Sequence, residues 1–166
     1  MKSRNAVALF ALMVVLSLSS NVLSQDHEHE QGTEHESGTL SEMDIAGINK
    51  VIDALENNYV KGDLEAVMAT FADNAVLLEG PGMNNGKKAI RDDHLGREFE
   101  MMTFPVFESK DRVIKGSGDI AYVYEMLTYQ TKRNSAEEPG RARTSRTIYI
   151  VERQPDNTWK IILMKM

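Results

Sequence analysis

Residues 71 to 82 read FADNAVLLEGPG, and this stretch separates a helical first part of the chain from a strand-rich second part. The apolar run 75–78 predicts a buried strand, because a short apolar run bounded by turn formers is typical of one. Glu79 follows at once, and Gly80-Pro81-Gly82 then prevents a regular strand from continuing. Glu79 is therefore either a charge where the strand reaches solvent or a carboxylate held at the mouth of a pocket.

Two helices are predicted before this stretch. Ser41-Glu42-Met43-Asp44 has the form of a capping box, and apolar residues then recur at helical spacing over residues 45–59. Gly62 ends this helix, and Asp63 caps a short second helix whose apolar residues extend to Phe71.

The part of the chain after residue 82 predicts one more helix and then strands. Asn84-Asn85-Gly86 forms a predicted turn, and residues 87–101 a third helix. Strands are predicted over residues 104–110, 120–133, 143–153 and 159–164, while residues 111–115 either prolong the first strand or bend away from it. Helices come first and long antiparallel strands last, so we expect an α+β fold in which a curved sheet wraps over a helical layer.

The first 24 residues are a predicted secretory signal peptide. Lys2 and Arg4 form a basic start, residues 6–18 an apolar run, and residues 22–24 the cleavage region. The run is too short for a comfortable membrane span, and no later stretch is apolar enough for one. We therefore expect a secreted or periplasmic protein without a membrane partner.

The composition limits the partners and cofactors. The formal net charge is −6, and removal of Lys2 and Arg4 with the leader makes it two units more negative. A nucleic-acid partner requires a basic face, so the charge argues against one. The chain contains no Cys, which excludes disulfides, and nothing in the sequence predicts a cofactor. The mature chain is nevertheless long enough to bury an ordinary core as one domain.

Residues 25–40 form a predicted disordered segment that is rich in His and acidic residues. Residues 25–39 contain no aliphatic residue, so burial cannot offset the entropy lost on ordering. His27, His29 and His35 could capture a metal ion, or the segment could be a solvated acidic spacer. His-x-His is a weak spacing signal, so both interpretations stay open.

The remainder, residues 41–166, resembles a known family. Three motifs carry the resemblance: Tyr59-x-x-Gly62-Asp63-Leu64, Phe71-Ala72-Asp73-Asn74-Ala75 and Gly86-x-x-Ala89-Ile90-Arg91. They are similar to the SnoaL-like and ketosteroid-isomerase-like branch of the nuclear transport factor 2-like superfamily, and Trp159 fits its last strand. The resemblance covers about residues 44 to 166 and implies a cone-shaped α+β fold with a mostly antiparallel sheet. Isomerases, cyclases, dehydratases and non-catalytic association domains share this fold, so it predicts function only broadly.

The resemblance also implies site residues. It places Glu79 at the general-base carboxylate of the steroid isomerases, His94 at a tyrosine of their hydrogen-bond network, and Asp93 at a pocket phenylalanine. A carboxylate and an imidazole that face a dry cone could move a proton beside a carbonyl. The acid donors of those isomerases are missing, since Leu55 and, within one residue, Thr147 stand at their positions. This argues against steroid isomerisation by that mechanism.

Alternation along residues 120–133 predicts which side chains line the cone. It places Tyr122, Tyr124 and Met126 on one face, and we expect these residues, with Thr147 and Tyr149, to line a ligand pocket. The opposite face is also apolar, with Ala121, Val123 and Leu127. A strand that is apolar on both faces favours a cover on each, and the second cover could be the partner of a homodimer. Arg141, Arg143 and Arg146 are either a solvated strand face or a convergent pair for an acidic ligand.

The leading hypothesis is a secreted small-molecule pocket protein that transfers a proton in an isomerase-, cyclase- or dehydratase-like reaction. Glu79 would be the base and His94 its polar partner. The alternatives are a non-catalytic dimeric ligand-binding or association domain, and metal capture by the His-rich segment.

Overall fold

The structure, a computed structural model, describes residues 39–166. The predicted signal peptide and the predicted metal-binding residues His27, His29 and His35 lie outside the described residues. At the start of the described part, Thr39 forms a β-bridge with Ser117, and Leu40 packs against the core. None of the helices in residues 39–166 has the length and hydropathy needed to cross a bilayer.

The first helix, α1 (Glu42–Lys61), confirms the predicted capping box. The Asp44 N–H donates to Ser41 Oγ at 3.2 Å, and the Ser41 N–H donates to Asp44 Oδ2 at 3.0 Å. Gly62 ends the helix with a φ of 72°, in the left-handed region that glycine enters without a steric penalty. One apolar face of α1 is buried, comprising Ile48, Val51, Ile52, Leu55 and Tyr59.

The segment after α1 contains less helix than predicted. Asp63 caps α2 (Leu64–Met68), as expected, but strand β1 (Phe71–Glu79) already begins at Phe71. Phe71 pairs with Ile161 of β6 (Trp159–Lys165), so tertiary pairing overrides the helical pattern of the sequence. Residues 84–86 were predicted as a turn, but Gly82–Asn85 forms a short strand, β2, antiparallel to β1.

The predicted third helix is divided into three pieces. These are α3 (Lys87–Ala89), the π-helix η1 (Ile90–Leu95) and α4 (Gly96–Met101). The Gly96 N–H donates to Arg91 O, five residues earlier, which is the π-type bond. A Cβ on Gly96 would lie 2.6 Å from Arg91 O, so this tight turn requires glycine.

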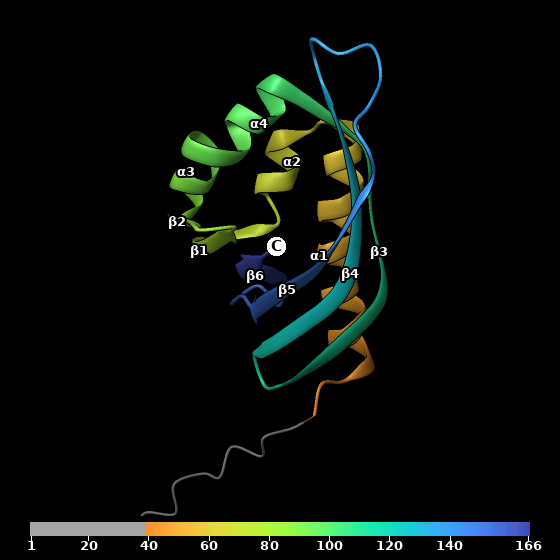
Figure 1. Ribbon diagram of the computed structural model, residues 1–166. Helices are drawn as coiled ribbons and strands as arrows, with labels where there is room; N and C mark the ends of the chain where they lie inside the picture. The colour runs from red at the N-terminus through yellow and green to blue at the C-terminus, as the bar shows by residue number, and fades with distance from the viewer. Residues whose placement is uncertain (1–38) are drawn as a thin grey trace, which may run out of the picture. The chain divides into compact units, whose positions relative to one another are not determined.

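One six-stranded sheet is formed, in the order β2-β1-β6-β5-β4-β3. The other strands of residues 39–166 are β3 (Met102–Ser117), β4 (Ile120–Arg133) and β5 (Arg143–Arg153), and in this part of the chain only the β1–β6 pair is parallel. Figure 1 shows the long β3–β4 ribbon curving beside α1, with α2, α3 and α4 on the side of β1 and β2. The predicted α+β fold, a curved and mostly antiparallel sheet over helices, is confirmed.

The concave face of the sheet and the helices enclose the core. On β4 the buried residues are Ala121, Val123, Glu125 and Leu127, and their β5 neighbours Thr147, Tyr149 and Val151 are also buried. Tyr122 lies on the other face and is 46% exposed. The inner face of β4 is therefore the odd-numbered one, opposite to the face expected from the sequence.

An ion cluster around Arg112 of β3 anchors the sheet to α1. The Arg112 Nε donates to Glu125 of β4 at 2.7 Å, and Nη1 donates to Asp53 at 2.6 Å and Asn49 at 3.0 Å. Nη2 donates to Glu56 at 2.9 Å and also to Ser109 at 3.1 Å. All five N–H donors of the guanidinium are therefore used. We refer to Arg112 with these five partners as the Arg112 cluster.

A β-bulge directs Arg112 into this cluster. The β3–β4 register shifts between Lys110 and Val113, and Asp111 has a φ of 57°. An extra residue in one strand reverses which side chains face inward beyond it, so the bulge allows Arg112 to reach Glu125 while Val113 stays half-exposed.

Candidate functional site

A cavity of about 720 Å³ opens where β1, η1 and α4 meet the ends of β3, β4 and β5. Its walls differ in chemistry, with acids and an imidazole on one side, aromatic rings below, and arginines on the β4–β5 side. The lining comprises Tyr59, Glu79, Gly80, His94, Glu98, Met102, Phe104, Phe107, Tyr129, Thr131, Arg133, Arg141, Arg143, Ser145 and Met166.

Glu79 stands at the end of β1 because a tight hairpin ends the strand there. Glu79 pairs with Gly82 across the β1–β2 hairpin, so Gly80 and Pro81 form its two-residue turn. Gly80 has a φ of 51°, which favours glycine, and Pro81 stiffens the turn. The side chain of Glu79 is 39% exposed and lines the cavity. The rigid turn thus fixes a strand-end carboxylate at a cavity wall.

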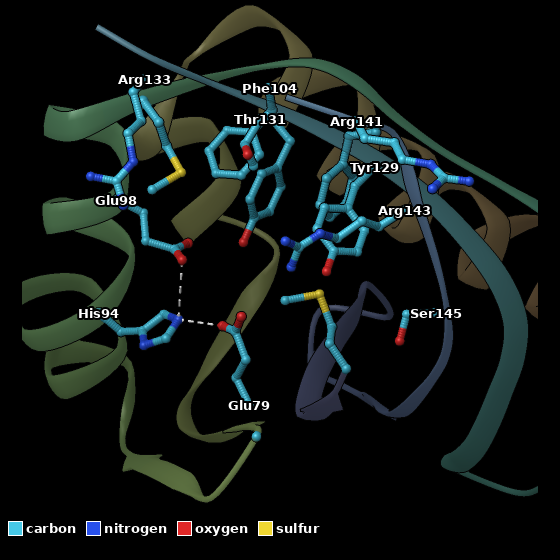
Figure 2. A pocket seen from close by; sticks show the side chains of 15 residues that line it. Glu79, His94, Glu98, Phe104, Tyr129, Thr131, Arg133, Arg141, Arg143 and Ser145 are labelled. Atoms are coloured by element: carbon cyan, nitrogen blue, oxygen red, sulfur yellow. Dashed lines mark hydrogen bonds and ion pairs between the residues drawn. The ribbon is translucent and has the colours of Figure 1, made fainter. Parts of the chain in front are cut away.

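His94 and Glu98 face Glu79 from the helical side. The His94 Nε2 lies 2.6 Å from Glu79 Oε2, within hydrogen-bond distance, and 3.8 Å from Glu98 Oε1. His94 and Glu98 are four residues apart, which brings them to one face where η1 continues into α4. Figure 2 shows both carboxylates directed at the same imidazole nitrogen. We call Glu79, His94 and Glu98 the acid–imidazole group.

The environment shifts the pKa of two members of this group toward the protonated form. The hydrogen bond with Glu79 raises the pKa of His94, although partial burial opposes this. Burial, followed by the charge of Glu79, raises the pKa of Glu98 to about 7. The site therefore holds exchangeable protons near neutral pH, as a group that transfers protons requires.

Stacked aromatic rings form the floor of the cavity. The rings of Tyr59 and Phe107 are parallel with centroids 4.0 Å apart, and Phe104 meets Tyr59 edge-on at 5.1 Å. Tyr59 is buried, and its hydroxyl has no hydrogen-bond partner within residues 39–166. Burial and then the charges of Glu98 and Glu79 raise the pKa of Tyr59, so its hydroxyl stays protonated.

The side of the cavity formed by β4 and β5 is basic. The inner face of β4 continues through Tyr129 and Thr131 to Arg133, and Tyr129 pairs with Arg143 of β5. Arg141 lies in the loop between these strands. Figure 2 shows the Arg143 guanidinium directed toward the acid–imidazole group and Arg141 directed away from it.

The acid–imidazole group could also hold a divalent cation. One ligand atom from each of the three residues lies within 4.8 Å of the others. An imidazole nitrogen with two carboxylate oxygens suits a borderline or hard ion, and the open cavity would leave positions for water or substrate. Such an ion would have to displace the proton that His94 shares with Glu79.

The structure brings together Glu79 and His94, as predicted, but not the other predicted site residues. Asp93 is exposed on η1 and does not line this cavity. Thr147 and Tyr149 face inward, but they are fully buried in the core and do not reach the cavity.

The prediction that Tyr122, Tyr124 and Met126 line the pocket was wrong. These residues occupy the outer face of β4, where Tyr122 pairs with Ile150 and Tyr124 with Ile148 of β5. Because both faces of this strand are apolar, alternation alone could not identify the inner face. The residues of β4 that do line the cavity are two to six positions beyond Leu127, namely Tyr129, Thr131 and Arg133.

Sequence reasoning missed Glu98 and the role of Tyr59. The i,i+4 spacing of His94 and Glu98 on a predicted helix was an available signal, but a glutamate on a helix usually belongs to a solvated face. Tyr59 fitted the apolar stripe of α1, and only the structure shows its hydroxyl without a partner among the described residues.

Comparison with known proteins gives a family and a fold. Residues 48–165 match the SnoaL-like domain family. A ketosteroid isomerase-like protein from Erwinia carotovora atroseptica is similar in structure, with a TM-score of 0.64, 20% identity, and coverage of 75% of this chain and 95% of that one. An NTF2-like protein from Pseudomonas putida KT2440 has a TM-score of 0.63, 20% identity, and coverage of 77% and 87%. A Nostoc punctiforme protein with a cystatin-like fold has a TM-score of 0.61, 21% identity, and coverage of 77% and 92%. No curated protein matches the sequence.

Proposed function

Because the chain belongs to the SnoaL-like domain family, we propose that it binds a small, partly apolar molecule in its cavity and moves a proton on it. One observation carries this proposal: Glu79 and His94, 15 residues apart in sequence, meet at 2.6 Å on the wall of a cavity floored by aromatic rings. A base and an imidazole within hydrogen-bond distance of each other have the geometry of acid–base catalysis.

The proposed roles follow from the contacts of each group. Glu79 holds His94 through Oε2, which leaves its Oε1 free to accept a proton from the substrate. His94, with a raised pKa, and Glu98, with a pKa of about 7, supply or take up the proton at the next atom. The Tyr59 hydroxyl would donate to negative charge that develops on a carbonyl or hydroxyl oxygen. This reaction class covers isomerisation, cyclisation and dehydration.

The test combines a binding screen with a proton-exchange measurement. Small carbonyl compounds that raise the Tm of the protein would be incubated with it in D2O, and exchange at the carbon next to the carbonyl followed by NMR. We expect catalysed exchange in the wild type and its loss in Glu79→Gln. Glu108→Gln, which removes an exposed carboxylate from β3 outside the cavity, is the matched control. Equal exchange in wild type and Glu79→Gln would refute the role of Glu79.

A second candidate function, association, is favoured by the outer face of the sheet. Tyr122 and Ile148 are 46% and 40% exposed, and the register places both beside further apolar side chains, Tyr124 and Ile150. We propose that this face joins two copies of the chain in a homodimer. Light scattering should show a dimer for the wild type and a monomer for Tyr122→Glu. A wild type that is monomeric at all accessible concentrations would refute this proposal.

Export and metal capture by the His-rich segment are separate proposals. If the leader is cleaved as the sequence predicts, N-terminal sequencing of the exported protein should start near Gln25. We expect His27, His29 and His35 to bind zinc or copper weakly, because a segment that the sequence predicts to be disordered would have to be ordered on binding. Calorimetry on the mature chain and on a chain that starts at Ser41 distinguishes this segment from the acid–imidazole group, which both forms retain. Sub-micromolar binding that is lost with the segment would instead favour metal capture.

A further inference from the structure

We infer that the molecule bound in the cavity is a small organic acid, whose carboxylate is held by Arg143, with Arg133 adding positive charge on the wall of the same cavity. This inference rests on the proposed function and names the chemical class of its substrate. It depends on three observations: the strand faces from which the arginines come, their lack of acidic partners within residues 39–166, and the other polar groups that line the cavity.

Strand geometry places both arginines on the concave side of the sheet. The buried residues of β4 have odd numbers as far as Leu127, and the same face continues through Tyr129 and Thr131 to Arg133. On β5 the inner face runs back from Tyr149 and Thr147 to Ser145 and Arg143. The two arginines therefore extend from the rows of side chains that build the core, and both line the cavity while remaining exposed to solvent.

The cavity arginines lack acidic partners, in contrast to the arginines of the structural ion pairs. Arg91, Arg112 and Arg153 each contact carboxylates within 4.0 Å. Within residues 39–166, no carboxylate lies at such a distance from Arg133, Arg141 or Arg143. In a chain with a net charge of −6, three arginines without acidic partners at one cavity mark a place where an external anion supplies the counter-charge.

The neighbouring groups suit a carboxylate. Thr131 and Ser145 also line the cavity, and their hydroxyls are neutral donors. A planar guanidinium binds a carboxylate through two parallel hydrogen bonds, which fixes the orientation of the ligand as well as its position. In Figure 2 Arg143 points toward the acid–imidazole group, so an acid held there would present its carbon skeleton to the aromatic floor and to Glu79.

The experiment compares an acid with its neutral isostere. Cinnamate and cinnamamide have the same shape and differ in charge, and calorimetry gives the affinity of each for the full mature protein. We expect cinnamate to bind at least about tenfold more tightly than cinnamamide, which corresponds to about 1.4 kcal/mol. The double variant Arg133→Gln with Arg143→Gln should remove this preference. Arg146→Gln, an exposed arginine on the outer face of β5, should retain it.

Several results would overturn the inference. These are equal affinity for the two probes, binding of neither, a preference that survives in the double variant, or an equal loss of preference in Arg146→Gln. Binding of inorganic phosphate without binding of cinnamate would reject a carboxylic acid in favour of a phosphate ester. Glu79→Gln separates this inference from the proposed function, because it should abolish proton exchange and still prefer cinnamate. A wild type that prefers cinnamate but catalyses no exchange would refute the proposed chemistry and leave the acid-binding site standing.

Discussion

The Arg112 cluster and the acid–imidazole group both collect carboxylates on the inside of one sheet, but they differ in how the charges are compensated. In the Arg112 cluster, one guanidinium with five hydrogen bonds lies among three carboxylates, and Glu125 is fully buried. In the acid–imidazole group, Glu79 and Glu98 share a single imidazole nitrogen and open onto a cavity. The first arrangement uses every donor of its cation, whereas the second leaves carboxylate oxygens and protons available to a ligand. The difference teaches that full use of the cation's donors separates the two sites, since in the Arg112 cluster too burial raises the pKa of Glu56 to about 7 and Glu125 Oε1 has no hydrogen-bond partner among the described residues.

The largest loss of stability is expected from breaking the Arg112 cluster. Arg112→Met should lower the free energy of unfolding by about 3–5 kcal/mol, because it leaves Glu125 and Glu56 buried without their cation. Urea unfolding followed by circular dichroism measures this loss. Arg91→Met, which removes a surface ion pair with Glu65, should cost much less, because solvent screens an exposed pair.

A double variant sharpens this test. Adding Glu125→Gln to Arg112→Met removes the most buried of the stranded charges, so it should recover part of the lost stability. A double variant that is no more stable than Arg112→Met alone would show that Glu125 is not where the cost arises.

Removing a charge from the acid–imidazole group is expected to raise the stability of the protein. The pKa of Glu98 lies at about 7 in the folded protein, above its ordinary value of 4.5, because burial disfavours the charged form. The free energy of unfolding should therefore fall as pH rises from 4.5 to 7, and the cost should be complete above pH 7. Glu98→Gln removes this cost and should stabilise the protein at pH 8 by about 1–3 kcal/mol. Unfolding curves measured between pH 4 and pH 8 test this, with Glu100→Gln, an exposed neighbour on α4, as the control. A destabilised Glu98→Gln at pH 8 would show instead that the charged form of Glu98 is stabilised by a partner in the folded protein.

The smallest effect concerns the imidazole itself. The hydrogen bond with Glu79 is the main cause of the raised pKa of His94, so Glu79→Gln should lower this pKa toward 6.5. The stability that His94 gains from this bond is complete below pH 6.5 and is lost as pH rises through its folded pKa. NMR titration of the His94 ring signals measures the shift, and Glu108→Gln should leave it unchanged. An unchanged His94 pKa in Glu79→Gln would show that the hydrogen bond with Glu79 does not raise this pKa.

The sequence predicted the elements whose signals are local. The capping box at Ser41, the glycine stop at Gly62 and the Asp63 cap depend on residues within a few positions of each other, and all three are present. The family motifs also placed Glu79 and His94, which the structure brings together. The early start of β1 depends on a partner strand about 90 residues later, and no local pattern contains that information.

The sequence could not predict two further features, for a different physical reason. Both faces of β4 are apolar, so the alternation fits equally well with Tyr122 or with Leu127 on the inner face. The sequence therefore could not identify the inner face. The Arg112 cluster joins α1, β3 and β4, and it depends on a bulge at Asp111 that the sequence does not reveal. Charged residues such as Glu125 are normally expected in solvent. The burial of Glu125 can be predicted only when its contact with Arg112 is known.

The position of β6 has a consequence for the order in which the domain can assemble. Strand β6 lies between β1 and β5, so Val76 near the start of the sheet pairs with Leu163 near the end of the chain. While the chain is being synthesised, β1 therefore has no parallel partner until residues 159–165 have emerged. Pairings over such a long loop form slowly, because the loop must close before its contacts repay the entropy. Until then the edges of β1 and β5 that face β6 stay unpaired, and unpaired strand edges favour aggregation during this interval.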